Sequence, residues 1–272
     1  MTRANVAIED DVLPCLTKGR RGSSKRAVKE KPAAIKEKFV ETRLSKIVEI
    51  VPKTENQSKA IQLMKKTQVT VLRGHSGTGK SLLACTTAAN SYLRGEYDHI
   101  VLIRPYEMVG KTVGLIPGTL EQKLYPLMQS MLQHLSKVFG KAELAAKIAD
   151  GTVVMESLEN VRGRSYARSV VIVDEAANVD PHAMKALLTR LEDSSKLIIC
   201  GDGHQKDTRG ISGIDWITEL MEKIRKNPPS YLSQEDVWQA HNNFGVISFT
   251  VDDVVRGGFC GLMVKVFDGE GV

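Results

Sequence analysis

Short runs of apolar, largely β-branched residues recur along the last three quarters of the chain. They lie at residues 69–73, 99–103, 152–155, 169–173, 196–200 and 246–250. Each run is apolar throughout instead of alternating, which is typical of strands that are buried on both faces. Longer segments with helical spacing separate most of the runs. The pattern predicts an α/β protein with a mainly parallel β-sheet flanked by helices.

Two segments depart from the simple alternation of strand and helix. Residues 108–150 are long for a single crossover, so we expect a loop followed by one or two helices. The sequence NPPS at 227–230 marks a break before the last portion of the chain. All apolar runs are far shorter than the roughly 20 residues that span a bilayer, and the amino terminus does not resemble a secretory signal. We therefore expect no membrane segment and a cytoplasmic protein.

Charge is concentrated near the amino terminus. The stretch from Lys18 to Lys38 contains nine basic and two acidic residues, whereas the whole chain of 272 residues carries a net charge of +6. This stretch has too few apolar residues to offset the entropy of ordering. The sequence predicts a basic, flexible tail over residues 1–40 and one domain over 41–272. Such a tail favours phosphate backbones, although it would equally serve as a solubilising leader.

The four cysteines show no CxxC pair and no histidines at ligand spacing. This argues against a zinc site and against a disulfide framework, and it suits a reducing cytoplasm. Cys85 and Cys200 lie inside apolar runs, so we expect them to be small core residues.

The sequence GHSGTGKS at 74–81 directly follows a predicted strand and precedes a predicted helix. It satisfies the P-loop (Walker A) pattern, in which glycines let several backbone N–H groups converge on a phosphate at a helix amino terminus. We expect the loop to bind through three glycines, two hydroxyls and one lysine: Gly74, Gly77, Gly79, Thr78, Ser81 and Lys80. Lys80 would reach the β- and γ-phosphates, and Ser81 would ligate Mg²⁺.

A P-loop needs an acidic partner for the metal at the end of a neighbouring strand. SVVIVDEAANVD at 169–180 provides it, because four apolar residues are followed by Asp174 and Glu175. We expect Asp174 to hold Mg²⁺ (the Walker B position) and Glu175 to polarise the attacking water.

The next predicted strand ends in KLIICGDGHQKD at 196–207, which places Asp202 and Gln205 at the same edge of the sheet. Gln205 would sense the γ-phosphate or orient water, whereas Asp202 would either face the crevice or cap the turn. We interpret His75 and His204 as non-catalytic.

Together these motifs resemble the superfamily 1 helicase arrangement and, more closely, the PhoH-like family of bacterial and phage P-loop ATPases. IRPYEMVGKTVGLIPGTLEQKLYPL at 103–127 is similar to that family's RP…G…LPG…K…P block, VRGRSY at 161–166 to its RGR block, and DDVVR at 252–256 to its terminal DVVR. The likeness runs in the family's order from about Thr54 to about Arg256. It implies a RecA-like P-loop NTPase fold in the cytoplasm of a bacterial cell or a phage-infected host.

The resemblance also implies roles that spacing does not show. Gln57 in TENQ matches the glutamine that reads adenine, which implies ATP. Arg256 matches the finger arginine, which stabilises charge on the transferred phosphoryl from a neighbouring subunit and so implies a homo-oligomer, a hexamer in this family. Arg104, Arg162 and Arg164 would touch phosphates or nucleic acid, or would form ordinary salt bridges.

This chain departs from the family pattern in two places. It has GDGHQKDTRG where the family often has GDxxQxDLP, and GGF follows DVVR in place of the usual HP. Some relatives carry a fused PIN ribonuclease domain, but residues 1–53 are too few and too basic for one.

Two functions of different classes follow. The first is an ATPase that uses Mg²⁺ and couples hydrolysis to RNA or single-stranded DNA; the alternative is an ATP-gated nucleic-acid-binding or assembly module with slow turnover. A small-molecule kinase suits the GDGHQ loop poorly. Aromatic residues for base stacking are few at 5%, and Tyr106, Tyr125 and Tyr166 would either stack or pack.

Overall fold

The computed structural model describes residues 43–105, 120–202 and 210–270. The predicted tail over residues 1–40 lies outside the described residues, and so does the start of the 108–150 segment.

Within these ranges six strands form one sheet, and each lies where an apolar run predicts it. They are β1 (Val69–Gly74), β2 (His99–Arg104), β3 (Val153–Ser157), β4 (Ser169–Val173), β5 (Lys196–Gly201) and β6 (Phe244–Phe249). Their order across the sheet is β3-β2-β4-β5-β1-β6, and all five pairings are parallel. The last strand begins at Phe244, slightly before the predicted residue 246. The α/β class and the parallel sheet are confirmed.

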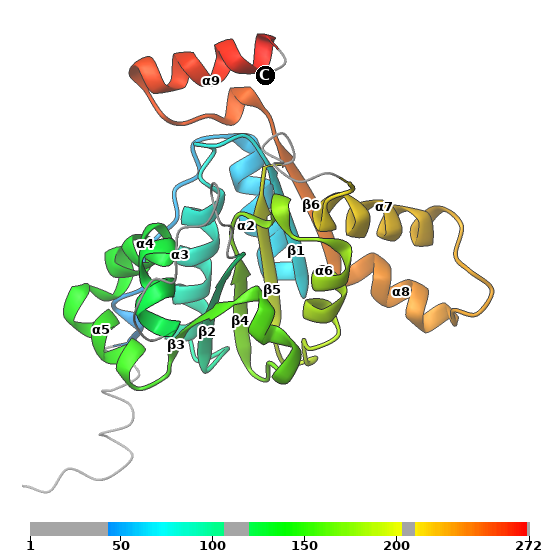
Figure 1. The fold of residues 1–272 in the computed structure, drawn as a ribbon, viewed down its shortest axis with the longest axis horizontal. Helices are drawn as coiled ribbons and strands as arrows, with labels where there is room; N and C mark the ends of the chain where they lie inside the picture. Colours follow the sequence, from blue (N-terminus) through cyan, green and yellow to red (C-terminus); the bar gives the residue numbers. More distant parts are fainter. Residues whose placement is uncertain (1–42, 106–119, 203–209, 271–272) are drawn as a thin grey trace, which may run out of the picture. The chain divides into compact units, whose positions relative to one another are not determined.

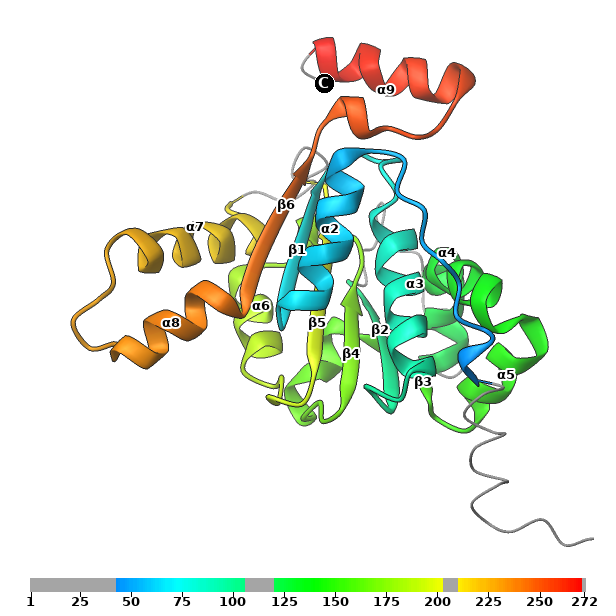
Figure 2. The same ribbon diagram turned by 180° about the vertical axis from the view of Figure 1, so that it is seen from behind.

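Helices cover both faces of this sheet, as Figures 1 and 2 show from opposite sides. One face carries α2 (Glu55–Lys66), α3 (Lys80–Leu93), α4 (Leu120–Phe139) and α5 (Lys141–Ala149). The other carries α6 (Pro181–Leu188) and α7 (Gly213–Lys226), with α8 (Gln234–Asn242) beside α7 and β6. The segment 108–150 therefore ends in two helices, within the predicted range, while residues 106–119 lie outside the description.

The strands are apolar throughout because successive side chains enter two different cores. Leu72, Ile100 and Ile172 face α2 to α5, whereas their neighbours Val71 and Val101 face the opposite layer. All five are at most 4% exposed. The expected burial of Cys85 and Cys200 is confirmed, since both are fully buried. Burial on both sides is what makes the runs continuous.

The chain ends in α9 (Gly258–Glu270), which follows the short 3-10 helix η3 (Val251–Asp253). Several of its apolar side chains are exposed, among them Phe259 at 75%. Within the described ranges, no helix combines the length and apolar content that crossing a bilayer requires.

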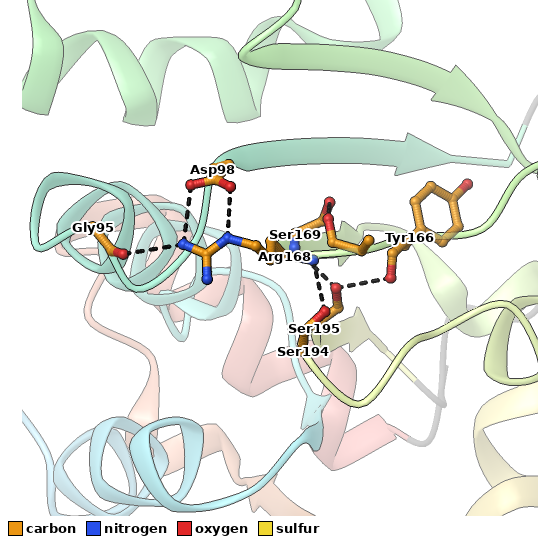
Figure 3. A network of polar contacts seen from close by, with 8 residues as sticks. Gly95, Asp98, Tyr166, Arg168, Ser169, Ser194 and Ser195 are labelled. Carbon is orange, nitrogen blue, oxygen red and sulfur yellow. Dashed lines mark hydrogen bonds and ion pairs between the residues drawn. The ribbon is translucent and has the colours of Figure 1, made fainter.

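The amino-terminal edge of the sheet is fixed by polar contacts around Arg168 (Figure 3), a non-glycine residue with a positive φ of 45°. Its guanidinium donates to both carboxylate oxygens of Asp98, at 2.6 and 3.1 Å. Its backbone N–H donates to Ser194, and that of Ser169 donates to Ser195. These residues immediately precede or begin β2, β4 and β5. The network therefore holds three strand starts together and offsets the strained backbone.

Lys196 at the start of β5 is only 7% exposed. Its ammonium donates to the carbonyl oxygens of Met64 and Thr67 at the carboxyl end of α2. A cation is favourable there because those carbonyls have no helical partner. Burial nevertheless lowers the pKa of Lys196 to about 8.

This pKa generates a test of stability against pH. The folded state releases the Lys196 proton at about pH 8, whereas the unfolded chain keeps it to about pH 10.4. The unfolded state binds more protons in that window, so stability rises with pH there, by up to about 3 kcal/mol. A neutral amine still has two N–H groups for the two carbonyls. Relative to Lys196→Met, the wild type should therefore gain free energy of unfolding between pH 8 and 10.4 in urea titrations. A difference that stays constant with pH would contradict the argument.

Candidate active site

The loop between β1 and α3 has the conformation that a P-loop requires. Gly77 and Gly79 have φ values of 85° and 88°, and Gly79 is the N-cap of α3. These positive φ values are open to glycine and strained for other residues. They turn the chain so that α3 begins at Lys80, with its free N–H groups and its positive dipole end at the loop. The geometry is that of an anion-binding helix amino terminus.

Lys80 lies over this loop. Its Nζ donates to the carbonyl oxygens of Gly74, at 2.5 Å, and His75, at 2.8 Å. Burial lowers the pKa of Lys80, while the nearby carboxylates of Asp202, Asp174 and Glu175 act in the opposite direction. The hydroxyl of Thr78 also donates to the carbonyl of His75, at 2.9 Å, so it braces the loop from inside.

Ser81 and Asp174 meet directly. The Ser81 hydroxyl donates to Asp174 Oδ1 at 2.8 Å, and Asp174 is 7% exposed at the end of β4. One part of the prediction was wrong, because β4 is not a neighbour of the P-loop strand: β5 lies between β4 and β1. The contact still forms because α3 carries Ser81 across the end of β5. β5 itself ends in Gly201, where a Cβ would lie 2.9 Å from the backbone nitrogen of Ala177, so only glycine fits beside the turn that follows Glu175.

Glu175 follows with a left-handed backbone, at φ 55° and ψ 37°. Burial raises the pKa of its carboxyl, and the adjacent Asp174 raises it further. Arg104, at the end of β2, donates through Nη2 to Glu175 Oε1 at 3.0 Å. Strained backbone of this kind gathers at functional sites.

The third strand end is described only in part. Asp202, which follows β5, is 5% exposed and lies in the wall of a cavity that Lys80, Asp174 and Glu175 also line. Gln205 and His204 lie outside the described residues, so the proposed γ-phosphate role of Gln205 stays a prediction.

Gln57 is buried against the P-loop. Its Nε2 donates to the carbonyl of Thr78 at 3.0 Å, and its Oε1 accepts from the N–H of Lys53 at 2.7 Å. The motif TENQ therefore lies at the loop, as the resemblance implies. Its role as an adenine reader stays a prediction.

Arg256 reaches the P-loop of its own chain. The N–H of Val255 donates to the carbonyl of Gly77 at 3.2 Å. Asn56 also binds Asp253 through a 2.7 Å hydrogen bond, which ties the DDVVR segment to the start of α2. A Cβ built on Gly77 would lie 3.0 Å from Arg256 Cδ. The side chain of Arg256 thus lies along the loop of its own chain, and the role from a neighbouring subunit that the resemblance implies stays a prediction.

Most of these groups line one cavity of about 340 Å³, whereas the predicted binding residues Gln57, Gly74 and Thr78 are not in its wall. Its lining includes part of the P-loop, three strand-end acids and two arginines: Ser76, Gly77, Gly79, Lys80, Ser81, Leu82, Arg104, Ser130, His134, Asp174, Glu175, Gly201, Asp202, Val255 and Arg256. The sequence reading missed Ser130 and His134 of α4. They are four residues apart on a helix whose Met128, Met131 and Leu135 are fully buried, but Ser130 itself is exposed, so the apolar pattern of the helix gives no signal for the pair.

The other candidate residues have structural partners or are unplaced. Arg164 forms an ion pair with the buried Glu156 at 2.8 Å, and Tyr166 donates its hydroxyl to the same carboxylate at 2.7 Å. Tyr125 is 49% exposed. The side chain of Arg162 and the whole of Tyr106 lie outside the description.

The residues present suit Mg²⁺ and a phosphate chain. Ser81 and Asp174 offer hard oxygen ligands on one wall of the cavity, beside the cradle of backbone N–H groups. No group of three or more His, Cys, Asp or Glu side chains able to hold a metal occurs among the described residues. A magnesium ion would therefore need further ligands from phosphate and water, as is usual for this ion.

Comparisons with known proteins identify the family of this chain. A family model for PhoH-like protein matches residues 49–242. The chain is 33% identical to a PhoH-like protein of Synechocystis over 76% of this chain and 63% of the relative, and 34% identical to Protein PhoH2 of Bacillus subtilis over 66% and 43%. The chain thus spans less than two thirds of the length of these relatives.

Solved structures give fainter likenesses. The large terminase of bacteriophage HK97 is 13% identical with a TM-score of 0.48, over 85% of this chain and 52% of that one. The UvsW helicase of bacteriophage T4 is 12% identical with a TM-score of 0.42, over 78% and 67%. The family model, by contrast, covers well over half of the chain, and the matched range includes the P-loop, Asp174, Glu175 and Asp202. This chain therefore belongs to the PhoH-like protein family.

Proposed function

We propose that this chain binds ATP and hydrolyses it with Mg²⁺. The observation that carries the proposal is the 2.8 Å hydrogen bond between Ser81 and Asp174 in the wall of the cavity that Lys80 and Glu175 also line. A glycine-rich turn without a nucleotide role would have no need of a buried carboxylate from a different strand beside its serine.

The residues divide the work by position. The loop N–H groups and Lys80 bind the phosphates, while the oxygens of Ser81 and Asp174 hold the metal. Bound Mg²⁺ would neutralise charge on the phosphates. Glu175 orients and polarises the attacking water, a role that its raised pKa suits because it makes the carboxylate a stronger base. Arg256 stabilises negative charge that develops on the phosphoryl group.

The choice of ATP rests on Gln57, which is fixed against the P-loop through Thr78. Coupling to RNA or single-stranded DNA rests on the basic stretch between Lys18 and Lys38 and on the family resemblance. An oligomeric ring, a hexamer in this proposal, rests on the resemblance alone.

One observation favours the second candidate, an ATP-gated binding or assembly module with slow turnover. The carboxylate that would act on water is held by Arg104 at 3.0 Å. A restrained base slows the chemical step without affecting nucleotide binding, which is how a gated module would behave.

The first test separates binding from chemistry. Lys80→Ala should remove ATP binding and turnover together, because the loop loses its cation. Glu175→Gln should keep ATP affinity but lower kcat by about 100-fold or more, the usual range for loss of a general base. Isothermal titration and phosphate release measure the two quantities, with Lys185→Ala and Glu192→Gln as exposed controls. Wild-type turnover in both site variants would remove the ATPase proposal.

The second test concerns the shape of the loop. Gly77→Ala adds a methyl group 3.0 Å from Arg256 Cδ at φ +85°, whereas Gly95→Ala meets nothing within 4 Å at φ +76°. Both changes strain the backbone by about 1 kcal/mol, so they form a matched pair. Only Gly77→Ala should weaken ATP binding, by about tenfold for an added clash of about 1–3 kcal/mol. Equal affinity in the two variants would show that the loop does not contact the phosphates.

The third test concerns the basic tail. Deleting residues 1–38 should weaken binding to single-stranded RNA and flatten its dependence on salt, by a slope of about 0.7 for each phosphate that the chain no longer neutralises. The control keeps the length and replaces the nine basic residues between Lys18 and Lys38 with Gln. Both variants should behave alike in fluorescence anisotropy at several salt concentrations. Unchanged binding in both would make the tail a spacer.

A further inference from the structure

Arg104 bridges three elements of the site. Its Nη2 donates to Glu175 Oε1 at 3.0 Å, and its Nη1 donates to the backbone carbonyl of Leu127 in α4 at 2.7 Å. The arginine itself ends β2, and Glu175 follows β4. One guanidinium thus connects the carboxylate proposed to act on water, the strand edge and the helix that forms the far wall of the cavity.

Two other polar groups that line the cavity also have partners within the protein. Lys80 binds two loop carbonyls, and the Ser81 hydroxyl binds Asp174. In the proposed reaction, Lys80 must exchange the loop carbonyls for phosphate oxygens before it binds the nucleotide. Ser81 must likewise exchange Asp174 for the metal as the partner of its hydroxyl. Glu175 is likewise paired, with Arg104.

We propose that Arg104 is a positioning residue that holds Glu175 in the paired orientation seen here, and that hydrolysis requires the Arg104–Glu175 ion pair to open. The inference rests on the proposed ATPase function. A general base must lie within hydrogen-bond reach of the water it activates. A carboxylate oxygen that already accepts from a fixed guanidinium is less available for that water.

The strength of the pair suits a contact that opens in each cycle. The side chains of Arg104 and Glu175 are 27% and 48% exposed. Partly exposed pairs are weak enough to open and close readily, and they bias the closed form by a factor of about two to five. The contact therefore restrains Glu175 without locking it.

The contact with Leu127 links the Arg104–Glu175 pair to α4. Ser130 and His134 of the same helix line the cavity, so a displacement of α4 would act on the cavity wall and on the carbonyl that orients Arg104. The restraint on Glu175 is thus coupled to the position of α4.

The test is steady-state ATP turnover of the full chain with Arg104→Met, which keeps the bulk of the stem and removes the donors. Without nucleic acid, kcat should rise about two- to fivefold, the weight of a partly exposed pair, while KM for ATP changes less than about twofold. Arg104→Lys keeps the positive charge but has a single nitrogen, which cannot bridge Glu175 and Leu127 as a guanidinium does. Its kcat should therefore lie between that of the wild type and that of Arg104→Met. A kcat that is unchanged or lower in Arg104→Met would overturn the proposal.

Two further variants assign the gain to Glu175. Adding Glu175→Gln to Arg104→Met should abolish the increase, and a gain that persists in this double variant would also overturn the proposal. Arg94→Met removes a comparable pair with Glu96 outside the cavity and should leave kcat unchanged. If ATP turnover of the wild type is absent, or is as high in Lys80→Ala as in the wild type, the ATPase proposal itself fails and this inference fails with it. If the wild type hydrolyses ATP and Arg104→Met is only slower, the inference alone fails.

Discussion

The hydrogen bond between Ser81 and Asp174 is the contact on which the organisation of the site depends. It joins the first turn of α3 to the end of β4, two strands away from β1 across β5. Gly201 at the end of β5 leaves room for Ile214 and for the backbone that follows Glu175, with which a side chain would collide. The P-loop serine and the buried carboxylate therefore meet at the carboxyl edge of a parallel sheet.

A second constraint is that polar groups in this cavity have partners within the protein. Lys80 and Ser81 bind loop and strand-end oxygens, and Glu175 binds Arg104. Buried polar groups without partners are costly, so a stable fold pairs them internally. Ligands must then compete with internal contacts. The affinity and the rate of such a site depend on the strength of these contacts as much as on the motif that identifies it.

The sequence predicted the elements of this site better than their relations. Continuous apolar runs located the strands, because burial on both faces leaves a strong signal, and the P-loop pattern located Lys80 and Ser81. The position of β5 between β1 and β4 was missed, since strand order depends on crossovers that local patterns do not encode. Ser130 and His134 were missed because their α4 positions have meaning only once the helix packs beside the loop. The Arg104–Glu175 pair joins residues 71 positions apart, and nothing near either residue specifies it.

The position of Arg256 changes the argument about assembly. An arginine supplied from a neighbouring subunit would make an oligomer necessary for a complete site. Here Val255 binds the Gly77 carbonyl, and Asn56 binds Asp253, so the segment that carries Arg256 is anchored to its own chain at the P-loop and at the start of α2. The aliphatic stem of Arg256 lies against Gly77. In the proposed site, the lysine, the carboxylates and this arginine would thus all come from one chain. The proposed ring therefore does not follow from the position of Arg256, and it rests on the family resemblance.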